Sequence, residues 1–214
     1  MANRSGPKGD EFERLMAKKL NEAYETEEFA KTPGSGALMG LTNFGKKMGL
    51  SEAVRRTLAS DLIVPDWFKF SVECKWYKNS PNYAAIIKGA DSDLDGWLGE
   101  TLYDAINTDL VPLLFFKTNN KGIHAVLPKY FGRDMSDTKT GDWIIPQYFC
   151  GYGDFVIFGL DYFLDNRRVF VDYATNMQKS WIDTWYTNSE HVKYLLENLK
   201  KVKAKQKNKP RKRK

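Results

Sequence analysis

Two β-prone runs stand close together between Asp61 and Trp76, in the segment DLIVPDWFKFSVECKW. In the second run, Lys69–Trp76, apolar and polar residues alternate. The apolar side chains of such a strand share one face, while Glu73 and Lys75 share the other. We therefore expect a strand that packs its apolar face on the core and presents a carboxylate and an ammonium outward.

The short linker PDWF between the two runs predicts an antiparallel hairpin. If the hairpin turns about Trp67, Asp61 lies opposite Glu73 on the neighbouring strand. Asp66 lies in the turn, about 20 Å from Glu73 along an extended strand. A magnesium ion needs oxygen ligands at about 2.1 Å, so two carboxylates that share it must lie close together. Asp61 and Glu73 are therefore the candidate metal-binding pair.

Apolar spacing predicts the remaining elements. Residues repeat with helical period over 10–23, 94–106 and 189–201, and β-prone runs cover 111–117, 123–127, 155–160 and 168–173. The glycine-rich segment 32–49 predicts a loop, after which Ser51 can cap a short helix through residue 58. The chain thus mixes strands and helices, and its length favours one compact domain, or one with an elaboration.

The basic charge is concentrated at the C-terminus. The whole chain has 33 Lys and Arg residues against 27 Asp and Glu residues. Residues 200–214 contain ten of these basic residues and no acid, so the rest of the chain is acidic. We expect this tail to be a disordered arm that binds a polyanion. Its candidate contacts are Lys200, Lys201, Lys203, Lys205, Lys207, Lys209, Arg211, Lys212, Arg213 and Lys214.

Cysteine and histidine are scarce, with two residues of each type. This composition excludes a multi-cysteine zinc site and a disulfide framework, and it favours a reducing compartment. Cys74 falls on the apolar face of its strand, which favours a small buried side chain over a nucleophile. The first residues lack an apolar signal core, and no apolar run is long enough to span a bilayer. We expect a cytoplasmic protein, of a prokaryote or a phage-infected cell, with no membrane partner.

Four motifs in a fixed order resemble the PD-(D/E)XK nucleases, and within them the archaeal-type Holliday junction resolvases, which have relatives encoded by phages. The motifs are KGDEFER at 8–14, PGSG at 33–36, DLIV at 61–64 and ECK at 73–75. A single acid-x-Lys triplet is weak evidence, because about three are expected in a random ordering of this composition. The order of all four motifs carries the resemblance, which covers about residues 8–127.

The resemblance implies a restriction-endonuclease-like α/β fold, in which helices flank a central mixed β-sheet. The nuclease core would comprise residues 8–127, and residues 128–199 would extend the same domain. The basic tail, 200–214, would follow as a disordered arm. No family motif falls in the segment after residue 127.

For the metal site, the resemblance implies that Asp61 and Glu73 bind Mg²⁺, with Mn²⁺ as a substitute and the Cys74 carbonyl as a further ligand. Glu13 would complete the acidic cluster. No small-molecule cofactor is expected. Each acid also has a simpler interpretation, because Glu13 can form a capping box with Asp10, and Asp61 can simply end a strand.

For the remaining site residues, the resemblance implies that Lys75 positions or activates the attacking water and that Ser35 acts near the scissile phosphate. Glu73 with Lys75 could instead be an exposed ion pair, and the Ser35 segment a plain turn. Glu100 stands where the family often has Gln; it could join the metal cluster or merely face solvent. The candidate DNA contacts outside the tail are Lys8, Arg14 and Lys31.

The implied activity is metal-dependent hydrolysis of four-way (Holliday) junctions by paired cuts. Two cuts on opposed strands require two active sites, so a homodimer is expected with branched double-stranded DNA as partner. Two alternatives stay open. One is a PD-(D/E)XK nuclease for other branched or duplex DNA, and the other is a non-catalytic protein that binds nucleic acid.

Overall fold

The computed structural model of the chain describes residues 7–33, 59–78, 83–88, 91–119, 121–128, 150–177 and 187–207. Ser35, most of the glycine-rich loop and the short helix expected to begin at Ser51 lie outside these residues. So do the tail residues from 208 onward.

Within the described residues, five strands form the central sheet, in the order β3-β4-β5-β7-β6. They are β3 (Phe70–Tyr77), β4 (Val111–Thr118), β5 (Ile123–Pro128), β7 (Phe155–Gly159) and β6 (Cys150–Tyr152). β3 and β4 run parallel, and the other neighbours are antiparallel. Gly122, with a φ of +78°, makes the tight connection from β4 to β5. The sheet is mixed and packs against helices, which confirms the predicted α/β class.

The predicted hairpin between Asp61 and Trp76 is wrong in its pairing. β2 (Leu62–Ile63) pairs antiparallel with β1 (Ala30–Lys31), and this pair forms a separate two-stranded sheet. The chain does turn where expected, since the Phe68 N–H donates to the Pro65 carbonyl at 2.9 Å. The ladder on β3 belongs instead to β4, which arrives about forty residues later along the chain.

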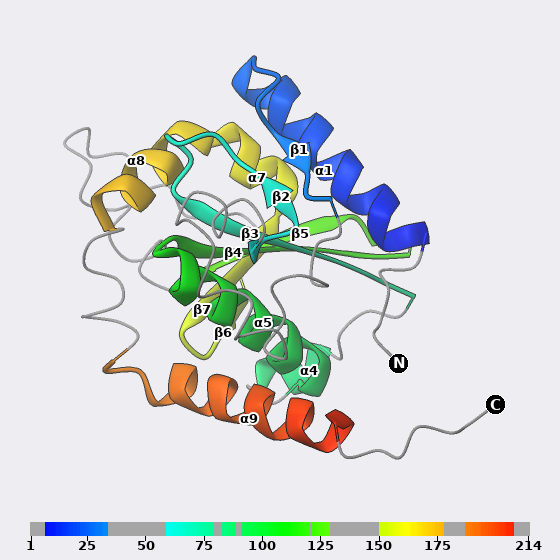
Figure 1. The fold of residues 1–214 in the computed structure, drawn as a ribbon, viewed down its shortest axis with the longest axis vertical. Helices are drawn as coiled ribbons and strands as arrows, with labels where there is room; N and C mark the ends of the chain where they lie inside the picture. Colours follow the sequence, from blue (N-terminus) through cyan, green and yellow to red (C-terminus); the bar gives the residue numbers. More distant parts are fainter. Residues whose placement is uncertain are drawn as a thin grey trace.

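Helices cover both faces of the sheet (Figure 1). α1, α7 and α8 lie on one side, while α5 lies on the other side with α9 packed on its outer surface. Their bounds are α1 (Pro7–Tyr24), α4 (Tyr83–Ile87), α5 (Ser92–Thr108), α7 (Leu160–Asp165), α8 (Arg167–Met177) and α9 (Glu190–Lys207). The helices predicted over 10–23, 94–106 and 189–201 are confirmed.

The segment 168–173 is helical, so the prediction of a strand there is wrong. Its alternation of Val169, Val171 and Tyr173 resembles a strand, but helical spacing decides the buried face. Phe170 and Ala174, four residues apart, are both buried. The Phe170 ring stacks on Phe158 and Phe163, with ring centroids 5.4 Å and 5.2 Å apart. This aromatic cluster favours the helix.

Helix α9 packs closely on α5 at Gly99. A Cβ at this position would lie 3.1 Å from the Leu195 carbonyl oxygen and 3.3 Å from the Leu199 Cβ, so glycine allows the two helices to approach. The helix also continues to Lys207, six residues beyond its predicted end. The expectation of disorder from residue 200 is therefore wrong for 200–207. Lys203 explains part of this extension, because its ammonium lies over the Tyr103 ring of α5.

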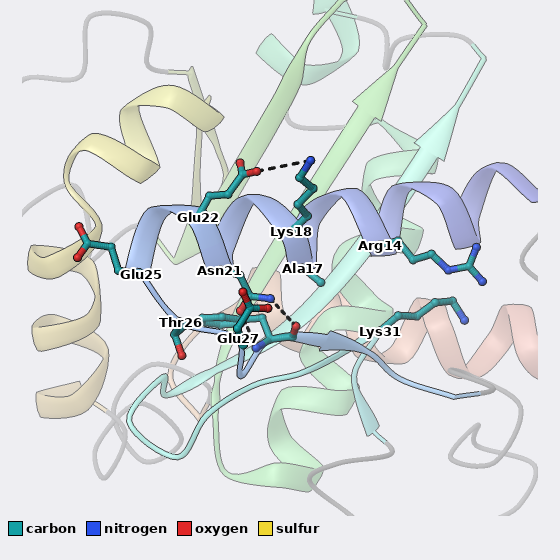
Figure 2. A pocket seen from close by; sticks show the side chains of 10 residues that line it. Arg14, Ala17, Lys18, Asn21, Glu22, Glu25, Thr26, Glu27 and Lys31 are labelled. Atoms are coloured by element: carbon teal, nitrogen blue, oxygen red, sulfur yellow. Dashed lines mark hydrogen bonds and ion pairs between the residues drawn. The ribbon is translucent and has the colours of Figure 1, made fainter.

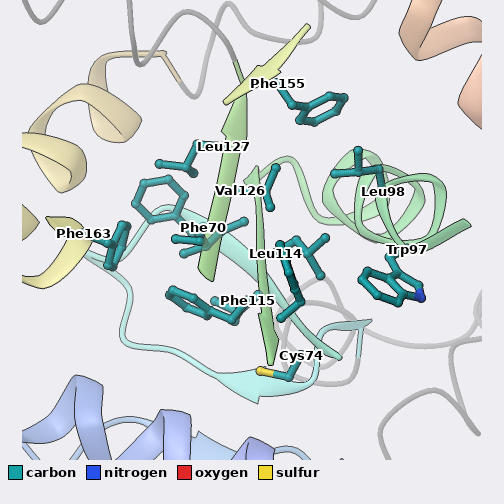
Figure 3. Close-up of a cluster of buried hydrophobic side chains, with 14 of the residues drawn as sticks. Phe70, Cys74, Trp97, Leu98, Leu114, Phe115, Val126, Leu127, Phe155 and Phe163 are labelled. Atoms are coloured by element: carbon teal, nitrogen blue, oxygen red, sulfur yellow. The ribbon is translucent and has the colours of Figure 1, made fainter. Parts of the chain in front are cut away.

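The core lies on both faces of the sheet (Figure 3). Trp97 and Leu98 of α5 pack on one face, while Phe163 of α7 contacts Phe70 and Phe115 on the other. Cys74 is buried within this cluster, as its place on the strand predicts. Within the described ranges, we find no helix with the length and apolar character needed to cross a bilayer.

Candidate active site

Asp61 lies against the open edge of β3. Its backbone N–H donates to the Val72 carbonyl at 2.9 Å, and its Oδ2 accepts a hydrogen bond from the Cys74 N–H at 2.8 Å. β4 pairs with the opposite edge, so Asp61 satisfies backbone groups that the sheet leaves open. In a strand, the N–H and C=O of one residue point to the same side. The Cys74 carbonyl therefore also faces the edge where Asp61 lies.

Glu73 and Lys75 share the face of β3 that α5 covers. Helix α5 packs on β3 and β4, and Glu73 is only 7% exposed. The expectation that the pair points outward to solvent is wrong for Glu73, because this face is covered like the apolar one. Lys75 forms an ion pair with Glu73 Oε1. The structure thus buries the Glu73 carboxylate and partly buries its ammonium partner, on either side of Cys74, whose N–H donates to Asp61.

Glu100 of α5 holds Lys75 from the other side. Its Oε2 lies 2.7 Å from the Lys75 Nζ. Burial acts to raise the pKa of Glu100, but the adjacent Lys75 ammonium prevails and holds that pKa below its ordinary value. The two roles that the sequence left open for Glu100 were metal ligand and solvent-facing residue. In the structure Glu100 contacts Lys75.

Glu13 of α1 is buried and engages Lys31 of β1. The Lys31 Nζ lies 3.4 Å from Glu13 Oε2 and 3.5 Å from Asp10 Oδ1. Burial raises the pKa of Glu13 above its ordinary value despite the Lys31 charge. Lys31, a candidate DNA contact, is therefore occupied by two carboxylates of α1.

Burial and mutual repulsion characterise the Asp61–Glu73 pair. Burial raises the pKa of Asp61 to about 6, assisted by the negative charge of Glu13 and opposed by Lys75. Burial, followed by the negative charge of Asp61, raises the pKa of Glu73 to about 8. The nearby carboxylates also raise the pKa of Lys75 well above its ordinary value, although burial opposes this shift. Two buried acids thus repel each other. The Lys75 ammonium pairs with Glu73 on one side and with Glu100 on the other.

This donor set fits a hard divalent cation. Carboxylate and backbone carbonyl oxygens are the ligands that Mg²⁺ and Mn²⁺ prefer, and a cation would stabilise the ionised form of both carboxylates, whose pKa values burial raises. Asp61, Glu73 and the Cys74 carbonyl are the atoms that fit. Across the seven described ranges, no three His, Cys, Asp or Glu residues form a group that could hold a metal ion. Glu13 is therefore near the pair without forming a three-carboxylate site with it.

A shallow groove of about 680 Å³ runs along α1 beside the segment 25–31 (Figure 2). Arg14 and Lys31 line one end of the groove, while Glu25 and Glu27 lie toward the other. Its charge is therefore mixed, and only the end near the start of α1 is basic. Arg14 is exposed there and remains a candidate phosphate contact.

The remaining candidate DNA contacts divide into two groups. Lys200, Lys201 and Lys205 are exposed on α9, whereas Lys203 is partly buried toward α5. Lys207 is the last residue of that helix. The other tail candidates lie outside the described residues, namely Lys209, Arg211, Lys212, Arg213 and Lys214.

The sequence did not reveal two features near the site. One is the contact of Glu100 with Lys75, for which only the helical spacing of α5 gave a signal. The other is a pair of lysines, Lys8 and Lys117, over the Trp76 ring. Lys117 comes beside Trp76 through the parallel register of β3 and β4, and nothing in the local sequence specifies that register.

Comparison with protein-family models yields a match over residues 4–146, about two thirds of the chain, to the family described as "Phage putative PDDEXK endonuclease". The matched segment contains Glu13, Asp61, Glu73 and Lys75. Searches of curated proteins and of solved structures gave no match.

Proposed function

The chain belongs to this phage PD-(D/E)XK endonuclease family, and we propose that it hydrolyses DNA phosphodiester bonds with a divalent metal bound by Asp61 and Glu73. We propose further that its preferred substrate is branched DNA, first of all the four-way junction. The observation that carries the proposal is the hydrogen bond from the Cys74 N–H to Asp61 Oδ2. It holds the aspartate at the strand that bears the Glu-x-Lys motif.

In this proposal, Asp61, Glu73 and the Cys74 carbonyl hold Mg²⁺ or Mn²⁺ at the edge of β3. The bound metal would supply charge stabilisation at phosphorus and lower the pKa of a coordinated water. Lys75 carries a permanent positive charge because two carboxylates hold its pKa high. From that position it orients the attacking water and stabilises the charge that develops on the phosphate.

Glu100 acts in this scheme as a positioning residue for Lys75. Its carboxylate fixes the ammonium from the α5 side, so that Lys75 does not bind to Glu73 alone. Glu13 and Lys31 form an ion pair that supports the site from α1 and β1, and the Glu13 carboxylate adds negative charge near Asp61. We propose that Ser35 approaches the scissile phosphate from its loop.

The preference for four-way junctions rests on the order of the four sequence motifs, which resembles the archaeal-type resolvases. Symmetric resolution needs two opposed cuts, so the proposed active form is a homodimer. Other branched or duplex DNA is the competing substrate. The exposed lysines at the C-terminal end of α9, Lys200, Lys201 and Lys205, would bind the arms of such DNA through its phosphates together with the tail.

The test compares labelled four-way junction, flap and plain duplex, each incubated with the protein with and without Mg²⁺ or Mn²⁺. We expect metal-dependent, symmetric paired nicks on the junction. Asp61→Asn should abolish cutting and retain junction binding. Lys193→Gln is the matched control, because Lys193 pairs with Glu190 on the exposed surface of α9; this variant should cut normally.

Each result has a defined meaning. Preferential cutting of flap or duplex overturns the junction proposal but keeps the nuclease. Binding to DNA without cutting under any metal condition overturns the nuclease and favours the non-catalytic alternative. Retained cutting by Asp61→Asn overturns the assignment of the metal site.

A further inference from the structure

Two lysines converge on one indole ring at the end of the motif strand. The Lys117 Nζ lies 4.3 Å from the centroid of the Trp76 ring, and the Lys8 Nζ lies 5.6 Å from it. They come from different elements, since Lys117 is on β4 and Lys8 lies in the first turn of α1. We name these three residues, Lys8, Trp76 and Lys117, the lysine–tryptophan cluster.

The position of the ring is fixed by its neighbours. The Trp76 Nε1–H donates to Asn119 Oδ1 at 2.8 Å, and Phe12 contacts the ring edge-to-face with centroids 6.4 Å apart. In the parallel register of β3 and β4, Trp76 lies directly beside Lys117. The ring is therefore a rigid support for both ammonium groups and not a mobile surface side chain.

Neither ammonium in the cluster is neutralised by a carboxylate within the described part of the chain. Four other lysines do have such partners: Lys18 with Glu22, Lys31 with Asp10 and Glu13, Lys75 with Glu73 and Glu100, and Lys193 with Glu190. Two positive charges held together by an aromatic ring repel each other and leave both charges available. An anion that contacts these ammonium groups would relieve the repulsion.

The cluster lies next to the proposed metal site without being part of it. Trp76 directly follows Lys75, and successive side chains of a strand point to opposite faces. Lys75 therefore faces α5, while Trp76 faces α1 through its contact with Phe12. An anion at the cluster would therefore bind on the α1 side of β3, one residue along the strand from Lys75.

From these observations we infer that Lys8, Trp76 and Lys117 form a phosphate-binding site for a nucleotide that flanks the cut. This inference rests on the proposed nuclease function and adds a contact to it. Lysine is suited to this role because its ammonium is a compact charge that can donate hydrogen bonds to phosphate oxygens in many orientations. The ammonium groups lie over the ring, which favours a phosphate contact over the stacking of a base on Trp76.

The test measures DNA affinity against salt concentration in the Asp61→Asn background, where no cutting occurs. The double substitution Lys8→Gln and Lys117→Gln removes two phosphate contacts. The slope of log affinity against log salt should become shallower by about 1.8, since each contact contributes about 0.9 on duplex DNA. In the cleavage-competent chain, the same double substitution should raise KM more than it lowers kcat.

The matched control replaces Lys18 and Lys193 with Gln, which removes the same net charge from two exposed lysines that pair within their own helices. We expect its salt slope to remain that of the parent. Equal slopes for the control and the cluster variant would overturn the inference, because net charge would then explain the effect. Lack of DNA binding by the parent itself would instead overturn the proposed function.

Two further variants separate phosphate binding from structural loss and from base stacking. Trp76→Phe retains an aromatic face and should preserve most of the part of the salt slope that the cluster contributes. Trp76→Leu should lose that part of the slope, with an unchanged circular dichroism spectrum. If abasic nucleotides beside the cut weaken binding as much as the lysine substitutions do, the ring stacks on a base and the phosphate assignment is wrong.

Discussion

Two pairs of carboxylates are buried around helix α5 to nearly the same extent, yet their partners differ. The site pair, Asp61 and Glu73, is 9% and 7% exposed, and the cap pair, Asp91 and Asp95, is 6% and 5% exposed. The site pair faces its own charges and the Lys75 ammonium. The cap pair faces neutral donors, since Asp91 accepts backbone N–H groups of α5 and Asp95 accepts the Tyr152 hydroxyl.

In the proposed function, a buried acid serves structure in the cap pair and chemistry in the site pair. Neutral donors satisfy a carboxylate completely, so the cap pair contributes to stability as it stands. In the site pair, Asp61 accepts the Cys74 N–H and Glu73 pairs with Lys75, yet burial raises the pKa values of both members. Burial alone therefore does not identify a catalytic acid. The chemical type of its partners does.

The largest expected effect comes from removing the ammonium that pairs with Glu73 and Glu100. Lys75→Met should lower the cutting rate by a factor of about 100 to 1000, because it removes a charge placed at the developing transition state. The measurement is single-turnover cleavage of labelled junction at saturating metal. Lys193→Met, at an exposed helical ion pair, should leave the rate within about twofold of the parent.

A Lys75→Met protein that cuts within threefold of the parent would show that Lys75 only balances charge. In that case the raised pKa of Lys75 would describe a structural ion pair.

The two pairs should respond to loss of charge with opposite signs. The folded pKa of Asp61 is about 6, above its ordinary 3.8, so ionisation of this carboxylate costs stability above about pH 6, and the cost disappears below about pH 4. Asp61→Asn should therefore stabilise the metal-free protein at pH 7.5 by about 1 to 3 kcal/mol. Asp95→Asn should destabilise it by about 1 kcal/mol, because hydrogen bonds from two tyrosine hydroxyls weaken.

Thermal unfolding in the presence of a metal chelator measures both effects. The same direction of change in the two variants would contradict the contrast between the pairs. Added Mg²⁺ should raise the melting temperature of the parent and not that of Asp61→Asn, since ligand binding stabilises only a protein that holds its site.

The smallest expected effect concerns the cap of α5. Asp91 Oδ1 accepts the N–H groups of Asp93 and Leu94 at 3.1 Å and 3.0 Å. Asp91→Ala removes this cap and should cost about 1 kcal/mol of stability with no change in the cutting rate. Asp93→Ala is the control, since this exposed acid in the first turn of α5 favours the helix dipole, and its loss should cost about half as much or less. A lost cutting rate in Asp91→Ala would place the cap pair in the chemistry.

Local patterns in the sequence predicted most of the secondary structure. The spacing of Leu94, Leu98 and Leu102 gave α5, and the four-residue spacing in α1 gave its buried stripe. The pairing of β3 was predicted wrongly, because its parallel partner β4 is distant in sequence and a hairpin is the nearest local solution. The segment 168–173 was predicted wrongly because Phe170 packs on rings from other elements.

The candidate site also has a part that the sequence predicted and a part that it did not. Placing Asp61 opposite the Glu-x-Lys strand required only counting residues about the turn. In the structure, Asp61 forms hydrogen bonds with Val72 and Cys74, the two residues on either side of Glu73. The burial of Glu73 under α5 and the ion pair of Lys31 with Glu13 depend on tertiary packing. No periodicity within a single segment encodes such contacts.

The position of β7 within the sheet has a consequence for the inheritance of this fold. β7 lies between β5 and β6 and pairs with β5 from His124 to Pro128, although it follows the segment that matches the family. Recombination between genomes that exchanged everything after residue 146 would remove two strands from the sheet. The new sequence would have to supply a strand for β5 in the same register. We therefore expect the two parts of the gene to be inherited together.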